Sequence, residues 1–207
     1  MANIVVSPIT STQATGQTLQ NDFTGPSGEK LVSNTHGGWY NLAYRSGVFT
    51  FNRTAVTLPV VASNLVSVFS IHNPVASGKN MEIIRIDIGL VIATTVVDTL
   101  GLYYSTCALA AASTFTTAGT ALSGIVGGNV NNSCIPYSAL THSGTPARHT
   151  ILGFYGATTT TNSNYWSYEP NGAILVPPGT VISLAMSTAA ATTSSFDGGI
   201  TWAEVPV

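Results

Sequence analysis

Apolar and polar residues alternate in short segments along the chain from Trp39 onward. The clearest segment is Glu82 to Ile92, in which every even-numbered residue from Ile84 onward is aliphatic. Successive side chains of a strand point to opposite faces of a sheet, so this period of two predicts one strand with an even-numbered core face. Its other face carries Arg85 and Asp87, which can pair with each other or with a neighbouring subunit.

Other segments are rich in β-branched and aromatic residues and are separated by turn residues, which indicates further strands. Leu65 to Asn73 is apolar on both faces, as expected of a strand covered on each side. Turns are predicted at Pro177-Pro178-Gly179, where glycine can adopt a positive φ, and at Asp197-Gly198-Gly199. The remaining strands are predicted at Val48–Arg53, Val56–Val61 (a strand start or edge, because of Pro59), Thr99–Thr106, His149–Gly156, Ala173–Val176, Val181–Thr188 and Ile200–Val205.

Hardly any segment has the pattern of a helix. Ala108 to Ala112 is long enough for one helical turn, and Ser113 to Ala147 is punctuated by glycine and proline and is predicted to be mostly a surface loop. Many short strands with Gly/Pro turns predict an all-β fold, an antiparallel β-sandwich or barrel.

The first 38 residues differ from the rest, because they are small, polar and aperiodic. Only Ile4, Val5 and Val6 and the pair Leu31-Val32 offer apolar anchors. We therefore expect residues 1–38 to form an extended N-terminal arm that orders against a neighbouring subunit, and residues 39–207 to form the sandwich body. The alternative is a frayed terminus.

Charge is scarce in this chain. Lysine and arginine number 6 and aspartate and glutamate 8, so charged residues make up 7% of the sequence, against about 25% in a typical globular domain. A folded monomer of this size exposes roughly 9,000 Å², or one charge per ~650 Å². Part of that surface is expected to be hydrated Ser, Thr and Asn, and the rest to be covered by other protein.

The same totals exclude several classes of partner. A net charge of −2 without any basic run argues against nucleic acid. The sequence contains no stretch of 18 apolar residues, so it predicts no membrane-spanning helix. The N-terminus lacks a signal-peptide pattern, so synthesis in a cytoplasm is expected, with Cys107 and Cys134 as free buried thiols. A disulfide between them is the alternative.

Catalytic and metal-binding patterns are not found. The chain has no Gly-x-Ser-x-Gly elbow and no phosphate-binding glycine loop followed by lysine. His142, His149 and Cys134 have a spacing that matches no standard metal motif. We therefore expect no enzyme activity, no cofactor and no catalytic or metal site, although calcium capture by loop Asp and Asn side chains stays open.

Surface contact is the expected role of the residues that stand out. Tyr and Trp are enriched at interfaces because they bury a large area at low entropic cost. Exposed rings near asparagine could instead stack sugars, so a glycan is a second possible partner. The candidate interface residues are Ile4, Val5, Val6, Trp39, Tyr40, Arg85, Asp87, Tyr165, Trp166 and Tyr168.

Two segments carry a family resemblance: SIHNPVASGKNMEIIRIDIGL (70–90) and EPNGAILVPPGTVISLAMSTAAATTSSFDGGITWAEVPV (169–207). They resemble strands of tailed-bacteriophage virion structural proteins of the jelly-roll type, especially head-decoration or cement proteins. The resemblance implies a jelly roll in a homo-oligomer, commonly a trimer. Such a trimer sits on the capsid surface of the virion and clamps neighbouring major capsid subunits.

The expected function is therefore non-enzymatic capsid decoration that stabilises the head. Three alternatives remain open. The first is a phage tail, fibre or host-receptor (glycan) binding protein of similar fold, which predicts the aromatics from Tyr165 to Tyr168 at an exposed loop tip. The second is a non-viral carbohydrate-binding module or surface-layer subunit, and the third is an enzyme.

Overall fold

The computed structural model describes residues 23–24, 30–31, 39–92, 98–106, 114–142, 144–155, 165–170, 172–187 and 195–207. The chain divides into two compact units, residues 1–38 and 39–207. In the first unit, β1 (Phe23–Thr24) pairs with β2 (Lys30–Leu31) in antiparallel fashion. Ile4, Val5 and Val6 lie outside the described residues, so the role of this unit as an arm stays a prediction.

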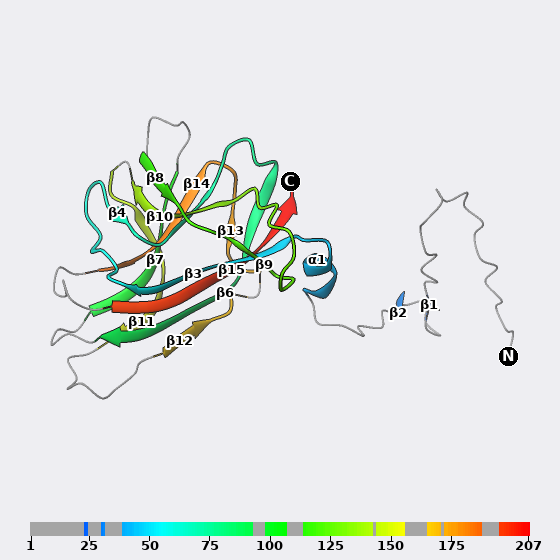
Figure 1. The fold of residues 1–207 in the computed structure, drawn as a ribbon, viewed down its shortest axis with the longest axis horizontal. Coiled ribbons are helices and arrows are strands. Elements are labelled where there is room, and N and C mark those ends of the chain that lie inside the picture. Colours follow the sequence, from blue (N-terminus) through cyan, green and yellow to red (C-terminus); the bar gives the residue numbers. More distant parts are fainter. Residues whose placement is uncertain are drawn as a thin grey trace, which may run out of the picture. The chain divides into compact units, whose positions relative to one another are not determined.

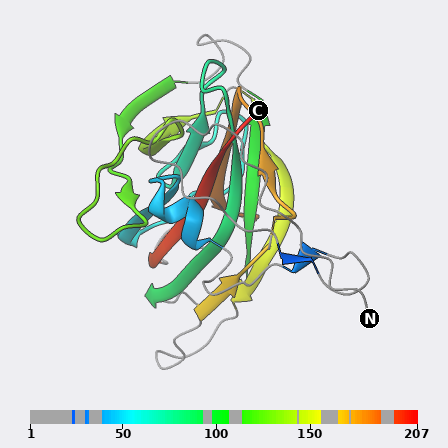
Figure 2. The ribbon, with the colours of Figure 1, turned by 90° about the vertical axis from the view of Figure 1, so that its right-hand side faces the viewer.

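The second unit is an antiparallel β-sandwich, which confirms the predicted all-β fold class (Figures 1 and 2). Sheet I has the order β12-β6-β15-β3-β9, with β13 beside β6, and sheet II has the order β11-β7-β14-β5-β10-β4, with β8 beside β10. The strands of sheet I are β3 (Val48–Val56), β6 (Lys79–Ile92), β9 (Leu122–Ser123), β12 (Tyr165–Tyr168), β13 (Leu175–Val176) and β15 (Ser195–Pro206). The strands of sheet II are β4 (Val66–Ser67), β5 (Ser70–Asn73), β7 (Asp98–Thr106), β8 (Thr114–Ala118), β10 (Ile135–Thr141), β11 (Ala147–Tyr155) and β14 (Thr180–Met186).

The core lies between the two sheets and is formed by their large apolar side chains. Trp202 of β15 is fully buried and packs against Phe49 of β3, with ring centroids 5.9 Å apart. Phe51 and Phe69 form a second aromatic pair at 5.0 Å. Strand β15 pairs along its length with β6 on one side and with β3 on the other, so it is the centre of sheet I.

A β-bulge in β6 changes which of its residues face the core. Thr201 pairs with Arg85 but Trp202 pairs with Ile83, which leaves Ile84 as the extra residue. Ile83 is therefore buried and Ile84 only half-buried, and the buried even-numbered face begins after the bulge. The prediction of one uninterrupted core face from Ile84 was wrong, because the alternation in the sequence gives no sign of the extra residue in the pairing with β15.

Other segments also differ from their predictions: only Val56 of Val56–Val61 lies in a named strand, and Leu65–Asn73 forms two strands, β4 and β5. Ser113 to Ala147, predicted as mostly loop, contains β8, β9 and β10, and β10 pairs with β5, β4 and β8. The chain after Trp39, predicted to read as strands and turns, begins with α1 (Tyr40–Tyr44). No helix among the described residues is long and apolar enough to cross a membrane. The prediction at Ala108–Ala112 lies outside those residues.

Glu204 is a buried carboxylate at the end of β15. It accepts hydrogen bonds from the backbone N–H groups of Ser133 (2.8 Å to Oε1) and Cys134 (2.8 Å), and Lys79 Nζ lies 3.0 Å from Oε2. Burial raises the pKa of Glu204, but the bonds from Cys134, Ser133 and Lys79 outweigh it and hold the pKa below its usual value. The carboxylate therefore stays ionised and fixes the chain before β10 to sheet I.

Cys134 is a free, buried thiol, as predicted, whereas Cys107 lies outside the described residues. Burial raises the pKa of the Cys134 thiol, and the nearby Glu204 raises it further. The thiol is therefore protonated and unreactive at neutral pH.

We expect Trp202→Ala to lower the free energy of unfolding by about 3–5 kcal/mol, because it leaves a cavity at the centre of sheet I. Denaturant titration measures this loss. Val205→Ala, on the exposed end of the same strand, is the control and is expected to change stability by less than about 1 kcal/mol. Equal effects of the two substitutions would contradict the central position of Trp202.

Candidate functional site

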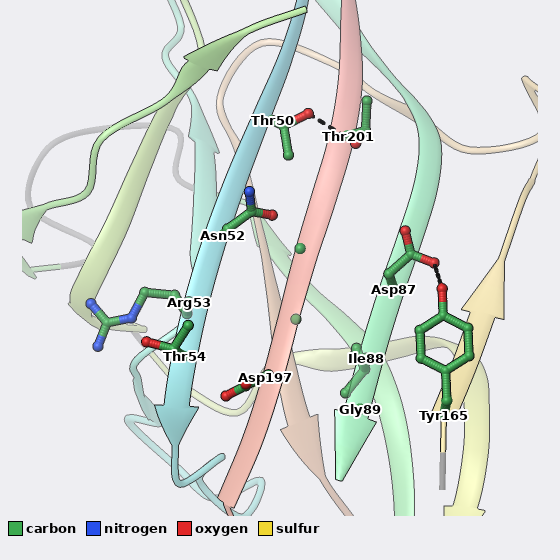
Figure 3. A pocket seen from close by; sticks show the side chains of 12 residues that line it. Thr50, Asn52, Arg53, Thr54, Asp87, Ile88, Gly89, Tyr165, Asp197 and Thr201 are labelled. Carbon is green, nitrogen blue, oxygen red and sulfur yellow. Dashed lines mark hydrogen bonds between the residues drawn. The ribbon is translucent and has the colours of Figure 1, made fainter. Parts of the chain in front are cut away.

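A groove of about 400 Å³ lies on the outer face of sheet I, across β3, β15, β6 and β12 (Figure 3). Cross-strand pairing explains its shape. Gly199 of β15 lies between Asn52 of β3 and Asp87 of β6 in one row. In the next row, Gly89 of β6 lies between Asp197 of β15 and Tyr165 of β12. Gly89 leaves the space between Asp197 and Tyr165 open, since a Cβ atom there would meet only the carbonyl oxygen of Asp197, at 3.9 Å, whereas the Asn52 amide lies over Gly199.

Glycine is required at both 198 and 199, but only Gly199 faces the groove, since Gly198 pairs with the buried Ile88. A Cβ atom at residue 199 would lie 2.1 Å from Asn52 Oδ1, and one at residue 198 would lie 2.7 Å from the carbonyl oxygen of Asp87. The predicted turn at Asp197-Gly198-Gly199 was wrong, since these residues lie within β15. The predicted positive φ at Gly179 is confirmed, at 82°.

Arg85, Asp87 and Tyr165 form a connected cluster at one wall of the groove. Tyr165 donates a hydrogen bond to Asp87 Oδ1 (2.6 Å) and accepts one from Arg85 Nη2 (3.0 Å). Arg85 Nε lies 2.6 Å from Asp87 Oδ2 and 3.8 Å from a carboxylate oxygen of Glu169. Of the two predicted partners of Arg85 and Asp87, each other or a second subunit, the structure shows the first.

The cluster keeps Asp87 ionised. Burial raises the pKa of Asp87, but hydrogen bonds from Tyr165, Ser167 and Arg85 together hold it below its usual value. The same contacts raise the pKa of Arg85, first through its hydrogen bonds to Asp87 and Tyr165. At neutral pH this wall is therefore an ion pair with an aromatic hydroxyl fixed to it.

The opposite wall is formed by β3 and the start of β15. Asp197 Oδ1 accepts a hydrogen bond from the backbone N–H of Ala55, at 2.5 Å. Ala55 has a left-handed φ of 49°, a conformation that is uncommon for alanine. The contact with Asp197 holds the end of β3 in this conformation and fixes the carboxylate at the groove. Arg53 also lines this side.

The aromatic candidates differ in their exposure to solvent. Tyr165, Trp166 and Tyr168 lie on β12, paired with β6, so the prediction of an exposed loop tip was wrong. Tyr165 is 60% exposed, whereas Trp166 and Tyr168 pack against the core. A Cβ atom at Gly153 of β11 would lie 2.1 Å from Trp166 Nε1, so this indole closes the sandwich between the edge strands of the two sheets.

The other aromatic group lies at α1. Tyr40 and Tyr44 stack with ring centroids 6.1 Å apart, and Tyr40 is exposed while Trp39 is half-buried. Their predicted role at an interface, like that of the groove residues, stays a prediction.

Sequence reasoning missed an exposed aliphatic loop, residues 122–130. Four of its side chains are exposed: Leu122 by 51%, Ile125 by 38%, Val126 by 100% and Val130 by 43%. The signal was available in the run Leu-Ser-Gly-Ile-Val-Gly-Gly-Asn-Val, which has aliphatic residues but no charge. Exposed aliphatic side chains gathered in one loop are typical of a protein contact.

Backbone contacts hold the aliphatic loop at both ends. Its β9 residues pair with Phe49 and Thr50 of β3, and Gly124 N–H donates to Val48 O at 2.7 Å. After the loop, Ser133 and its neighbour are bound by the buried carboxylate of Glu204. The loop is thus a protrusion with fixed ends.

His142 lies in a buried network of hydroxyl groups. Its Nδ1 is 2.6 Å from Ser105 Oγ and its Nε2 is 2.7 Å from Ser183 Oγ, which in turn is 2.7 Å from Ser70 Oγ. The imidazole is 1% exposed, so no substrate can reach it. His142, His149 and Cys134 have different neighbours, and no three acidic, His or Cys side chains among the described residues could hold a metal ion.

Comparison with solved structures finds the protein described as "Structure of a marine algae virus of the order Picornavirales". It is 12% identical to this chain, the match covers 97% of this chain and 84% of that one, and the TM-score is 0.25. A likeness of this size carries no argument about function. No protein-family model matches the chain, and no curated protein matches it.

The buried histidine predicts a pH dependence of stability. Burial lowers the pKa of His142 from 6.5 to about 4. Between these values the unfolded chain binds the proton and the folded chain does not, so the stability is full above about pH 6.5 and falls as the pH decreases toward 4. The loss from this residue is expected to reach about 3 kcal/mol.

Denaturant titrations of wild type and His142→Asn between about pH 7 and pH 4.5 measure this loss. At the lower limit ordinary carboxylates, with pKa values of about 3.9–4.3, also take up protons, and wild type and the variant share that contribution. The variant is expected to have a flatter profile than wild type. His72→Asn is measured beside it, because burial also lowers the pKa of His72 and gives the same sign. Identical slopes for wild type and H142N would contradict the assignment.

Proposed function

We propose that this chain is a non-enzymatic structural protein of a virion, a decoration or cement protein that binds the outer capsid shell as a homo-oligomer, a trimer. Its partner is the major capsid protein. The observation that carries the proposal is the aliphatic loop, whose exposed Leu122, Ile125, Val126 and Val130 lie in a chain with very few charges.

The uncharged surroundings of the loop favour docking on another protein. Between Asp98 and Arg148 the chain has no Asp, Glu, Lys or Arg. A surface without charge loses little solvation free energy when a partner covers it. Burial of an aliphatic side chain contributes up to about 1.5–3 kcal/mol. Since three of the four side chains are already partly covered, one loop supplies a few kcal/mol, which is a weak contact by itself.

A shell multiplies such weak contacts. Subunits joined as an oligomer place several loops on the same lattice, and the second contact then forms at a high effective concentration. The fixed ends of the loop reduce the entropy lost on binding. A protein that binds the assembled shell and not the free capsid subunit stabilises the shell by mass action. This mechanism requires no catalysis.

We expect Val126→Asp to weaken attachment to capsid shells by about 10–100-fold, because it removes one aliphatic contact and buries a charge. The measurement is co-sedimentation with shells assembled without this chain. Val75→Asp is the matched control, since Val75 is also an exposed turn valine, at 60%. Equal attachment of the two variants would remove the loop from the proposed interface.

Deletion of residues 1–30 tests the proposed arm separately. We expect a folded oligomer whose attachment to the same shells is weaker, because the body has its own core in residues 39–207. Analytical ultracentrifugation gives the oligomeric state and co-sedimentation gives the affinity. An unchanged affinity would exclude the arm from the contact, and a monomer that binds no shell at full length would overturn the whole proposal. Electron microscopy of labelled particles distinguishes a shell position from a tail or fibre position.

A further inference from the structure

The groove on the outer face of sheet I takes no part in the docking proposed for the aliphatic loop. Its volume of about 400 Å³ is at the lower end of the range for small-molecule sites, roughly 300–1,000 Å³. Its walls lie on four paired strands, so they are held in place before any ligand arrives. We propose that the groove binds a neutral carbohydrate, with a sugar unit over Gly89, between Tyr165 and the Asn52 amide that covers Gly199.

The charges at the groove favour a neutral ligand. Asp87 and Asp197 line it, and Arg53 and Arg85 lie in or beside it, so the two signs are balanced. The attraction of the two guanidinium groups for an anion is offset by repulsion from the two carboxylates, and the attraction of the carboxylates for a cation is offset by the guanidinium groups. A neutral ligand meets neither repulsion and loses less solvation free energy on entry.

The polar groups of the walls match those of a polyhydroxylated ligand. Asp87 and Asp197 are acceptors, while the Asn52 amide can donate and accept. Asn52 and Asp87 lie on opposite sides of Gly199, two strand spacings or about 10 Å apart along the sheet. A sugar ring has hydroxyl groups around its whole edge, so it can donate to the carboxylate on one side and bond the amide on the other.

Tyr165 supplies an ordered aromatic surface. Its ring is 60% exposed, and Figure 3 shows it broad side on at the edge of the groove. Its hydroxyl is fixed by Asp87 at 2.6 Å and by Arg85 at 3.0 Å, so the ring loses little freedom when a ligand stacks on it. The C–H groups on one face of a sugar ring can pack on such a surface while its hydroxyl groups face the polar walls.

A peptide fits this groove less well. The floor strand β15 is paired with β3 on one side and with β6 on the other, so an added peptide strand would find no unpaired edge there. Apolar peptide side chains would cover Asn52 and the two aspartates without bonding them, which costs free energy.

The test uses the full-length chain and a panel of neutral disaccharides: maltose, cellobiose, lactose and N,N′-diacetylchitobiose. Glucosamine and glucuronic acid serve as the cationic and anionic probes. We expect at least one neutral probe to bind with a dissociation constant of about 1–10 mM. Binding is followed by the NMR shifts of the backbone amides of Gly89, Gly198 and Gly199. The charged probes are expected to bind more weakly than the best neutral one.

Three variants locate the site. Tyr165→Ala is expected to weaken binding by about 3–10-fold through loss of the aromatic contact. Asn52→Ala is expected to have a similar effect through loss of hydrogen bonds, and it tests the opposite wall if Y165A does not fold. The matched control is Tyr44→Ala, which removes an exposed tyrosine, 72% exposed, that is not part of the groove lining.

The proposal is overturned if no neutral probe at about 10 mM shifts the glycine amides. It is also overturned if the shifts lie elsewhere, or if folded Y165A and N52A bind as Y44A does. Stronger binding of a charged probe would replace the neutral ligand with that class. None of these results depends on attachment to a capsid shell, so the two proposals fail separately.

Discussion

The buried carboxylate of Glu204 is the contact that joins the two sheets and fixes the chain after the aliphatic loop. A carboxylate without partners in the core would cost several kcal/mol, so it requires donors on every side. It has them in the backbone N–H groups of Ser133 and Cys134, in the Lys79 ammonium and in the indole N–H of Trp202, at 3.4 Å. Its partners belong to segments far apart in the sequence, which this one side chain brings together. It ties the end of β15 in sheet I to the start of β10 in sheet II.

Strand β15 has three functions along its length because of its central place in sheet I. Its first half lines the groove on the outer face, where Gly199 leaves room for the Asn52 amide and Asp197 forms part of one wall. Its second half turns Trp202 into the core and ends at Glu204, which fixes the chain after the aliphatic loop. The strand is therefore at once the floor of the groove, part of the core and the anchor of the loop. A shift in its register would affect all three.

The sequence predicted most strands of the body because their side chains alternate in the expected way. β7 was predicted at Thr99–Thr106 and spans Asp98–Thr106, and β14 was predicted at Val181–Thr188 and spans Thr180–Met186. The bulge at Ile84 could not be predicted, because it depends on the pairing with β15 and not on β6 itself. The strands within 113–147 were hidden by glycine and proline, which mark turns locally while long-range pairing decides the fold.

The candidate site was predicted only in its parts. Arg85 and Asp87 were predicted to pair with each other or with a neighbouring subunit, and Tyr165 was a separate aromatic candidate for an interface. What joins them is the antiparallel register of β12 on β6, which brings Tyr165 beside Gly89 and within reach of Asp87. The role of Gly199 depends on its cross-strand neighbours on β3 and β6. Sequence patterns within one strand do not contain such cross-strand rows, so the groove became visible only with the sheet.

The aliphatic loop and the groove share strand β3, and this limits how binding at one can affect the other. Leu122 of the loop pairs with Thr50, two residues before Asn52 of the groove wall. The Thr50 hydroxyl is 3.0 Å from that of Thr201 on β15, which closes the groove at this end (Figure 3). Both surfaces thus rest on the same set of paired strands and on one core. A partner at the loop would meet a rigid body, since moving β3 would break its pairing with β15. Any influence of the loop on the groove is therefore expected to come from a partner that covers its rim, and not from a change in the sheet.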